Sequence, residues 1–292
     1  MKVALVHDYL TEMGGAERVV ESLMSIFPEA PVYTSIYNPE VSSDRFSADN
    51  VRTSFMQQLT TGKESSKRLF PLFPLAFRGF DLAGFDVVLS SSSGFAHHVR
   101  PRREALHVCY CHTPPRFLWQ SDLYFARQPQ IRQLLGPVLP SFRRRDLQAA
   151  RLVDAYVANS ATVARRIEQT YGRKAEIIHP PVETSAFEPS TERSGRFLVV
   201  SRLLPYKRIG LAVEAATRAS LPLDVIGDGP ARPKLEQAAG PTVRFLGRQD
   251  DEVVRHAMAR CIALVVPGSE DFGLTPVEAH ASGRPVVAFA SG

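Results

Sequence analysis

The sequence predicts an α/β protein of two domains, each with a parallel sheet covered by helices. Short apolar runs without polar alternation recur along the chain, and they alternate with segments whose apolar residues fall at helical spacing. The chain has 292 residues, which corresponds to two domains of roughly 100–200 residues each. A proline pair at 180–181 and a polar stretch to residue 195 separate two such series of elements. These observations together predict two sheets joined by a linker.

The first series starts at the N-terminus. Residues 3–7 are expected to form a buried strand, Gly14 and Gly15 follow it, and the apolar residues between 16 and 27 line one face of a helix. The remaining strands expected in this series are residues 31–36, 86–91, 105–111, 154–159 and 176–180, with a helix at 160–171. Strands and helices in this order favour right-handed crossovers between parallel strands.

Residues 37–85 do not follow this alternation. Within them, residues 63–80 combine basic side chains with large apolar ones and two prolines. Such a mixture is typical of a segment that lies in a membrane interface. It also fits a short buried helix with basic ends that covers the sheet. We favour the buried helix, because nine apolar residues with two prolines can belong to a core.

The second series is more regular. Its expected strands are residues 196–201, 221–227, 242–247, 261–267 and 284–290, and its expected helices are 207–219, 231–239, 250–260 and 276–282. We therefore expect two Rossmann-like domains that face a cleft, with boundaries at 1–182 and 183–292.

Composition narrows the class of protein. The chain is 44% apolar and 22% charged, which is typical of a globular protein. Its three cysteines are too few for a disulfide framework and favour a reducing compartment. No apolar run is long enough for a membrane span or a signal peptide. The expected location is the cytoplasm.

The charge is uneven. Residues 1–180 carry 22 Lys and Arg against 17 Asp and Glu, which accounts for the whole net charge of +5. This excess points to an anionic partner, such as a phosphorylated substrate or an acidic membrane surface, or else it forms a solvated basic face. Nucleic acid is not expected, because the chain has no recognised nucleic-acid module and its aromatic residues are not interleaved with the basic clusters.

Two motifs in the first domain contain candidate ligand-binding residues. Gly14 and Gly15 lie between a strand and a helix, where glycine permits close ligand approach and the helix N-terminus favours anions. The alternative is a tight turn that needs glycine for its backbone. His112 ends the strand 105–111, where ligands bind in open α/β sheets, or it is a structural histidine. A metal site with Cys109 and Cys111 is not expected, because His112 points to the opposite face of the strand.

Two further motifs lie in the second domain. Arg202 and Lys207 flank a turn before a helix and could clamp a diphosphate, or they are exposed surface cations. Glu270 follows the apolar strand 261–267 and could bind sugar hydroxyls, and Gly273 allows its loop to approach a ligand. Glu278 has a local alternative, because Thr275 and Glu278 fit a capping box at the start of the next helix.

The spacing of Glu270 and Glu278 is the E-x7-E signature of retaining GT-B glycosyltransferases, and the whole chain resembles their family 4, the group 1 glycosyl transferases. The matching segments are GGAERV, HTPPR, SRL with YKRI, VIGDGP (225–230), RFLG and PGSEDFGLTPVEA, in the order of the family. The segments YCHTPPRFLW and SRLLPYKRIGLAVEA further resemble bacterial mannosyltransferases of the WbaZ type, which build O-antigen and exopolysaccharide.

The resemblance implies roles for individual residues. It assigns the donor diphosphate to Arg202 and Lys207, the donor sugar hydroxyls to Glu270, the ribose to Glu278, and a place beside the transferred sugar to His112. The other donor-binding positions that it implies are Gly14, Gly15, Gly227, Asp228, Phe272, Gly273, Leu274 and Thr275. No metal or other cofactor is implied, and the sequence lacks a D-x-D carboxylate pair.

The implied reaction is retaining transfer of a hexose from a nucleotide sugar to a lipid-linked glycan. The first domain would bind the acceptor, with peripheral contact to an anionic membrane, and the second would bind the donor. GDP-mannose is the favoured donor, and UDP-sugars are the alternative. The family continues beyond the position of Ser291 and Gly292, so we expect an incomplete second domain with an exposed sheet edge. A truncated remnant that binds a nucleotide or a surface without transfer is the competing hypothesis.

Overall fold

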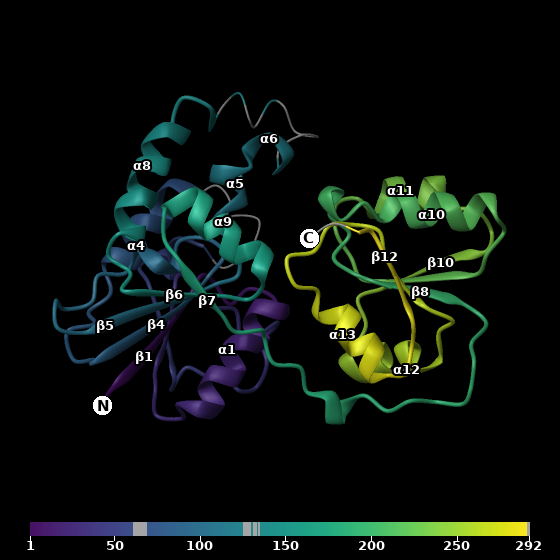
Figure 1. The fold of residues 1–292 in the computed structure, drawn as a ribbon, viewed down its shortest axis with the longest axis horizontal. Helices are drawn as coiled ribbons and strands as arrows, with labels where there is room; N and C mark the ends of the chain where they lie inside the picture. The colour runs from purple at the N-terminus through teal and green to yellow at the C-terminus, as the bar shows by residue number, and fades with distance from the viewer. Residues whose placement is uncertain (61–68, 125–129, 131–132, 134, 291–292) are drawn as a thin grey trace. The chain divides into compact units, whose positions relative to one another are not determined.

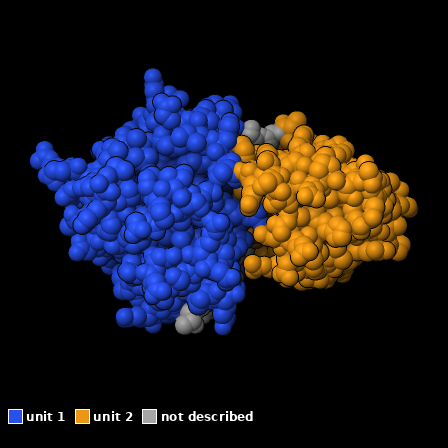
Figure 2. All heavy atoms as spheres, turned by 90° about the horizontal axis from the view of Figure 1, so that it is seen from below, with its two compact units in different colours: residues 1–181 blue, residues 182–292 orange. Residues whose placement is uncertain are grey.

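The computed structural model describes residues 1–60, 69–124, 130, 133 and 135–290. The chain divides into two compact units, Met1–Pro181 and Val182–Gly292 (Figure 2). Each unit contains one sheet in which all described strand pairs are parallel. The α/β class predicted from the sequence is therefore confirmed, and the division lies one residue before the expected boundary.

The sheet of the first unit has seven strands in the order β3-β2-β1-β4-β5-β6-β7. These strands are β1 (Val3–His7), β2 (Val32–Thr34), β3 (Val51–Thr53), β4 (Val87–Ser92), β5 (Leu106–Cys111), β6 (Ala155–Ala158) and β7 (Ala175–Ile177). The chain moves outward from β1 to β3 and then returns to the other side of β1. The order therefore reverses between β1 and β4, which is where open α/β sheets bind ligands.

The first unit has more helices than the sequence predicted. They are α1 (Gly15–Ile26), α2 (Met56–Leu59), α4 (Phe73–Arg78), α5 (Arg116–Trp119), α6 (Ser121–Tyr124), α8 (Leu139–Ala150) and α9 (Ala161–Tyr171), with 3₁₀ turns η1 (Phe70–Leu72) and η2 (Ala96–His98). Of these, α1, α9 and the short buried helix α4 were expected. The strand β3 was also missed, because three residues are too few to show a strand pattern.

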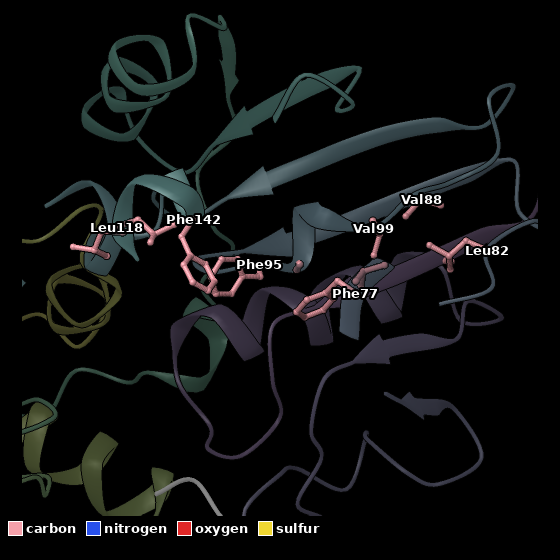
Figure 3. Close-up of a cluster of buried hydrophobic side chains, with 11 residues drawn as sticks. Phe77, Leu82, Val88, Phe95, Val99, Leu118 and Phe142 are labelled. Atoms are coloured by element: carbon pink, nitrogen blue, oxygen red, sulfur yellow. The ribbon is translucent and has the colours of Figure 1, made fainter. Parts of the chain in front are cut away.

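Alternate residues of β1 face different layers. Ala4 and Val6 belong to a cluster with residues of α4 and α8, whereas Val3 and Leu5 belong to a cluster with Val20 of α1. This two-residue period is that of a strand covered on both faces. Figure 3 shows the first cluster, whose labelled members are Phe77, Leu82, Val88, Phe95, Val99, Leu118 and Phe142.

The segment 69–80 contributes to this core. Pro74, Ala76 and Phe77 of α4 are buried, and the side chain of Phe77 is fully enclosed. Leu75 lies on the outer side of the same helix and is 60% exposed. The described part of the segment is therefore a short buried helix, as favoured from the sequence. Residues 63–68 of the expected interfacial segment lie outside the described residues.

The second unit contains every strand and helix expected from the sequence. Its sheet order is β10-β9-β8-β11-β12. The strands are β8 (Phe197–Val200), β9 (Leu223–Ile226), β10 (Val243–Gly247), β11 (Leu264–Val266) and β12 (Val286–Ala288), and the helices are α10 (Ile209–Arg218), α11 (Arg232–Ala238), α12 (Asp251–Arg260) and α13 (Leu274–Ala281), with 3₁₀ turns η3 (Thr184–Ala186) and η4 (Pro205–Lys207). Helices α10 and α11 cover one face, and α12 and α13 cover the other (Figure 1).

Two further expectations concern the whole chain. Among the residues that the structure describes, no helix combines the length and the apolar composition needed to cross a bilayer. The three cysteines, Cys109, Cys111 and Cys261, are buried and form no disulfide. The first two pack in the apolar cluster between β5, β6 and α9.

Candidate functional site

In the second unit, a depression lies where the strand order reverses between β8 and β11. It is lined by Val200, Ser201, Lys207, Ile209, Val265, Val266, Pro267, Gly268, Glu270 and Thr275. Three of the residues singled out from the sequence, Lys207, Glu270 and Thr275, therefore share one site at the carboxyl ends of neighbouring strands. This is the position at which parallel sheets bind ligands.

The charged groups of this site form an ion pair. Lys207 Nζ lies 2.6 Å from Glu270 Oε1 and 2.7 Å from Glu270 Oε2. The two side chains are 17% and 26% exposed, so the pair remains open to water. The Lys207 ammonium and the Glu270 carboxylate neutralise each other unless a ligand competes for one of them. A phosphate would compete for Lys207, and a sugar hydroxyl would compete for Glu270.

Close backbone contacts hold the pair in place. A Cβ atom on Gly268 would lie 2.7 Å from the carbonyl oxygen of Lys207, so the loop after β11 packs against the backbone of η4. At Gly227, whose φ is +127°, a Cβ atom would lie 1.9 Å from the carbonyl oxygen of Ser201. Only glycine permits either approach. These glycines are therefore explained by contact between two loops of the protein.

The other donor-binding candidates of the second unit are not among the residues that line this depression. Arg202 is exposed and lies two residues after the end of β8. Asp228 is exposed, and its Oδ1 accepts a hydrogen bond of 2.7 Å from the backbone N–H of Gly229, which shapes the turn. Phe272 and Leu274 are half-buried at the start of α13.

The start of α13 corrects one interpretation. The helix begins at Leu274, its N-cap is Gly273 with φ +83°, and no side chain caps it. Thr275 is thus inside the helix and not its cap, and the alternative of a capping box with Glu278 is wrong. Glycine at the cap admits a left-handed backbone that Thr275 would adopt only with strain. Glu278 is buried, with 7% of its surface exposed, one turn into the helix.

In the first unit, the carboxyl ends of β1, β4 and β5 carry a chain of polar side chains. His112 Nε2 lies 2.8 Å from Ser91 Oγ. Ser91 Oγ lies 3.1 Å from His7 Nδ1, and His7 Nε2 lies 3.4 Å from Glu17 Oε1 in the first turn of α1. His7 and Glu17 are buried, with 2% and 6% exposed.

Burial and the hydrogen bond between His7 and Glu17 shift the pKa of each of these groups in opposite directions. Burial lowers the pKa of His7, but the hydrogen bond to Glu17 and its negative charge outweigh burial and raise this pKa above 6.5. Burial raises the pKa of Glu17, and the same partner reverses the shift, so its pKa is lowered. Both groups are therefore held in their charged forms inside the protein.

The glycine pair begins the helix that supplies Glu17. Gly14 is the N-cap of α1, and Gly15 is its first residue. A Cβ atom on Gly14 would lie 3.1 Å from Glu17 Oε2. The small residue therefore leaves room for the Glu17 carboxylate to turn toward the sheet.

Besides Glu17, two buried carboxylates of the first unit were not identified from the sequence. Asp8 accepts hydrogen bonds from the backbone N–H groups of Ser93, Phe95 and Ala96, at 2.6, 2.8 and 2.7 Å. It thereby shapes the loop after β4. A polar residue directly after a buried strand was the one available signal, but the partners lie more than eighty residues away.

Asp146 is the second missed carboxylate, and it is fully buried in α8. Its Oδ1 lies 3.1 Å from His97 Nε2 and 3.0 Å from His98 Nε2. Its Oδ2 accepts hydrogen bonds from Trp119 Nε1 at 2.7 Å and Tyr171 OH at 2.9 Å. Among the described residues, His97, His98 and Asp146 are the one group with spacing suited to a metal ion. Four protein groups already surround this carboxylate, so the cluster is explained as structural.

No metal site was expected at Cys109 and Cys111, because His112 points to the opposite face of the strand. The two cysteines pack in the apolar cluster under α9. His112 instead contacts Ser91, whose partner His7 and the carboxylate of Glu17 lie on the face covered by α1.

The fold defines the class of protein. The chain is similar to sucrose-phosphate synthase from Thermosynechococcus elongatus, with a TM-score of 0.71 and 16% identity over 100% of this chain and 82% of that one. It is also similar to Anabaena Alr3699/HepE in complex with UDP and glucose, with a TM-score of 0.69 and 16% identity over 100% of this chain and 82% of that one. The fold is that of the GT-B glycosyltransferases.

The family follows from the sequence matches. The model for Glycosyltransferase Family 4 matches residues 13–186, and the model for glycosyl transferases group 1 matches residues 194–292. The chain belongs to Glycosyltransferase Family 4.

Curated relatives cover part of the chain. A D-inositol 3-phosphate glycosyltransferase of Geodermatophilus obscurus is 34% identical over 173 residues, which are 48% of this chain and 38% of that protein. The protein of the same name from a Nocardioides species is 26% identical over 186 residues, which are 50% of this chain and 40% of that protein. The matched part thus spans about two fifths of the length of these relatives.

Proposed function

We propose that this chain is a glycosyltransferase that moves a hexose from a nucleotide sugar to an acceptor, with the donor bound by the second unit and the acceptor by the first. The observation that carries the proposal is the pair formed by Lys207 and Glu270 at the switch point of the second sheet. The family resemblance assigns these two positions to the donor diphosphate and to the hydroxyls of the donor sugar.

The chemistry follows from the charges present. Departure of a nucleoside diphosphate leaves negative charge on its phosphates, and Lys207 and Arg202 provide cations that can stabilise this charge. The backbone N–H groups at the start of α13 add a positive dipole end beside the same depression. We propose that donor binding separates Lys207 from Glu270, after which each contacts its own part of the donor. No metal is needed in this scheme, and retention of configuration is part of the proposal.

The identity of the donor base is separate from the class of reaction. The resemblance favours GDP-mannose, but the curated relatives are named D-inositol 3-phosphate glycosyltransferases, and a structural neighbour was solved with UDP and glucose. Neither supports mannose or guanosine. We therefore propose a nucleoside diphosphate hexose, and the base is decided by the experiment below.

We propose that the first unit binds a lipid-linked glycan acceptor and contacts an anionic membrane at its cytoplasmic face. The reaction would then be a step of polysaccharide synthesis. Burial and the positive charges of the nearby Arg100 and Arg145 lower the pKa of Arg78 there. Leu75, from the same helix as Arg78, is exposed. Basic and apolar side chains together favour an acidic lipid surface.

Vesicle flotation tests the membrane contact. We expect the protein to float with vesicles that contain phosphatidylglycerol and to remain below with pure phosphatidylcholine. The double variant Arg100→Gln/Arg145→Gln should float less than the wild type. Equal flotation of the variant and the wild type would contradict the assignment.

Nucleotide binding tests the donor site. We expect one of the pairs GDP with GDP-mannose or UDP with UDP-glucose to raise the free energy of unfolding by about 2.7 kcal/mol at 100 times its dissociation constant. Lys207→Met should abolish this gain, whereas Lys234→Met on the exposed face of α11 should retain it. No response to any of the four nucleotides would overturn the proposal, and binding without release of nucleoside diphosphate would favour a non-catalytic nucleotide-binding protein.

A further inference from the structure

We propose that Glu17, His7 and Ser91 are positioning residues for His112, and that they hold its ring neutral, with the proton on Nδ1. The proposal rests on the proposed function, because His112 is the residue expected beside the transferred sugar. The three positioning residues have no assigned role in donor or acceptor binding.

The fold brings these four residues together from distant parts of the chain. His7 ends β1 and pairs in register with Ser91 of β4. The backbone N–H of His112, directly after β5, donates to the carbonyl oxygen of Ser92 at 2.8 Å. Glu17 reaches the strand ends from the first turn of α1, which packs on β1 and β4. The four side chains form one connected series from α1 across three strands.

The partners of His7 fix the positions of its protons. Its Nδ1 lies 3.2 Å from the carbonyl oxygen of Ser91, and a carbonyl can only accept, so Nδ1 carries a proton. Its Nε2 faces the carboxylate of Glu17 at 3.4 Å, which also accepts. Both ring nitrogens of His7 are therefore donors, and the ring is an imidazolium.

The direction of the next hydrogen bond follows. Because His7 Nδ1–H also points at Ser91 Oγ, at 3.1 Å, this oxygen accepts from His7. The Ser91 hydroxyl then has its own proton to donate, and His112 Nε2 lies 2.8 Å away. His112 Nε2 thus accepts, which leaves the ring proton of a neutral His112 on Nδ1.

The charges along the series support a neutral His112. A cationic His7 lies one hydroxyl group away from His112 and opposes a second positive charge there. Glu17 balances the charge of His7, and Asp8 adds a further negative charge near it. Glycosyl transfer develops positive charge on the sugar ring. A neutral histidine beside that ring can donate a hydrogen bond without repelling this charge.

The neighbouring serine offers a matched control. Ser90 is also fully buried, and its Oγ lies 2.9 Å from His107 Nε2. It is adjacent to Ser91 on β4 and therefore faces the other side of the sheet. Ser90→Ala breaks a buried serine–histidine pair of the same kind without touching the series that ends at His112.

The ring protonation of His112 can be measured in the whole chain labelled with ¹⁵N-histidine, without any substrate. We expect the wild type and Ser90→Ala to show a protonated Nδ1 and an unprotonated Nε2 on His112. Ser91→Ala should shift this tautomer balance, Glu17→Gln should shift it in the same direction, and Ser91→Thr should restore the wild-type pattern. A protonated Nε2 in the wild type, or an unchanged spectrum in both Ser91→Ala and Glu17→Gln, would overturn the proposal.

Transfer kinetics give the second measurement. With the donor that the binding experiment identifies, Ser91→Ala should lower kcat by about 10² with little change in the donor KM, because the His112 ring is present but its hydrogen-bond donor is misplaced. Ser91→Thr should recover most of the rate, and Ser90→Ala should retain it. An equal loss in Ser90→Ala and Ser91→Ala, at equal thermal stability, would indicate a merely structural role.

The two proposals fail in different ways. The expected tautomer pattern without binding of any nucleotide would contradict the proposed function and leave the positioning series intact. Nucleotide binding and transfer with an unperturbed His112 in the variants would contradict the positioning series alone.

Discussion

The two units place polar groups at the same position of the same kind of sheet, but they use different means. In the first unit, buried side chains bond to one another at the ends of β1, β4 and β5. In the second unit, backbone contacts at Gly227 and Gly268 shape the loops, and one partly exposed ion pair provides the charge.

The polar groups of the two units differ in how easily they can exchange partners. A buried charge without its partner is costly, so the networks of the first unit cannot open without loss of the fold. The Lys207 pair in the second unit is reached by water and can exchange its partner for a ligand at low cost. We therefore expect the first unit to present a preorganised surface and the second to rearrange on binding.

The largest expected effect is in the first unit. Asp146→Ala removes the buried carboxylate that four side chains contact, and it leaves His97 charged without its partner. We expect a loss of about 3–5 kcal/mol in the free energy of unfolding, measured by urea titration. Glu168→Ala on the exposed side of α9 is the control and should stay within about 0.5 kcal/mol of the wild type. A small effect of Asp146→Ala would show that this network does not stabilise the unit.

Gly227→Ala is the corresponding destabilising substitution in the second unit. The new Cβ would overlap the carbonyl of Ser201 at a left-handed φ, so we expect a loss of about 3 kcal/mol in the unfolding of that unit. Gly195 has φ +68° with open space around it, and Gly195→Ala should cost only about 1 kcal/mol. Equal losses would mean that backbone conformation, and not close approach, explains Gly227.

The pH dependence of stability should reflect the first unit. Burial lowers the pKa of His98 and of His107 to about 4. The unfolded chain binds these protons near pH 6.5, so each residue destabilises the fold by about 1.4 kcal/mol per pH unit as pH falls from 6.5 to 4.

The raised pKa values of His7 and His97 have the opposite effect on the pH dependence of stability. Their stabilisation is complete below pH 6.5 and is lost as pH rises through their folded values. Thermal unfolding at several pH values measures both effects. His107→Gln should remove about half of the acid slope that His98 and His107 produce together, and an unchanged slope would contradict the assignment.

The smallest stability effect is expected at the ion pair. Lys207→Met should change the free energy of unfolding by about 0–1 kcal/mol, because the pair is partly exposed. The same variant should lose nucleotide binding, so comparing the two measurements separates a binding residue from a structural one. A loss above about 3 kcal/mol would place Lys207 with the buried networks of the first unit.

The sequence predicted much of the second unit and less of the first. Every strand and helix of the second unit follows an apolar run or a helical pattern of ordinary length. The helix α8 and the strand β3 escaped prediction, because one carries a run of arginines and the other has only three residues. The capping box at Thr275 was predicted wrongly, because Gly273 can adopt a left-handed φ and starts the helix earlier.

The site residues of the two units also differ in how well the sequence predicted them. Lys207 was identified because it flanks a turn before a helix, and Glu270 because it follows a strand, and both are local features of the chain. His7, Glu17 and Ser91 were not identified as partners of His112, and no local pattern connects them. The polar end of an otherwise apolar strand at His7 was the available sign.

The sequence by itself determined the order of strands and helices, the parallel class of both sheets and the residues that stand at strand ends, because these depend on neighbouring residues and on spacing along the chain. Only the tertiary structure decided which of those residues meet. His7 faces Ser91 because the chain returns to place β4 beside β1, and Asp146 meets His97 and Tyr171 because α8 packs against two distant segments. Such contacts depend on how the strands are ordered across the sheet, which is set by packing over the whole unit.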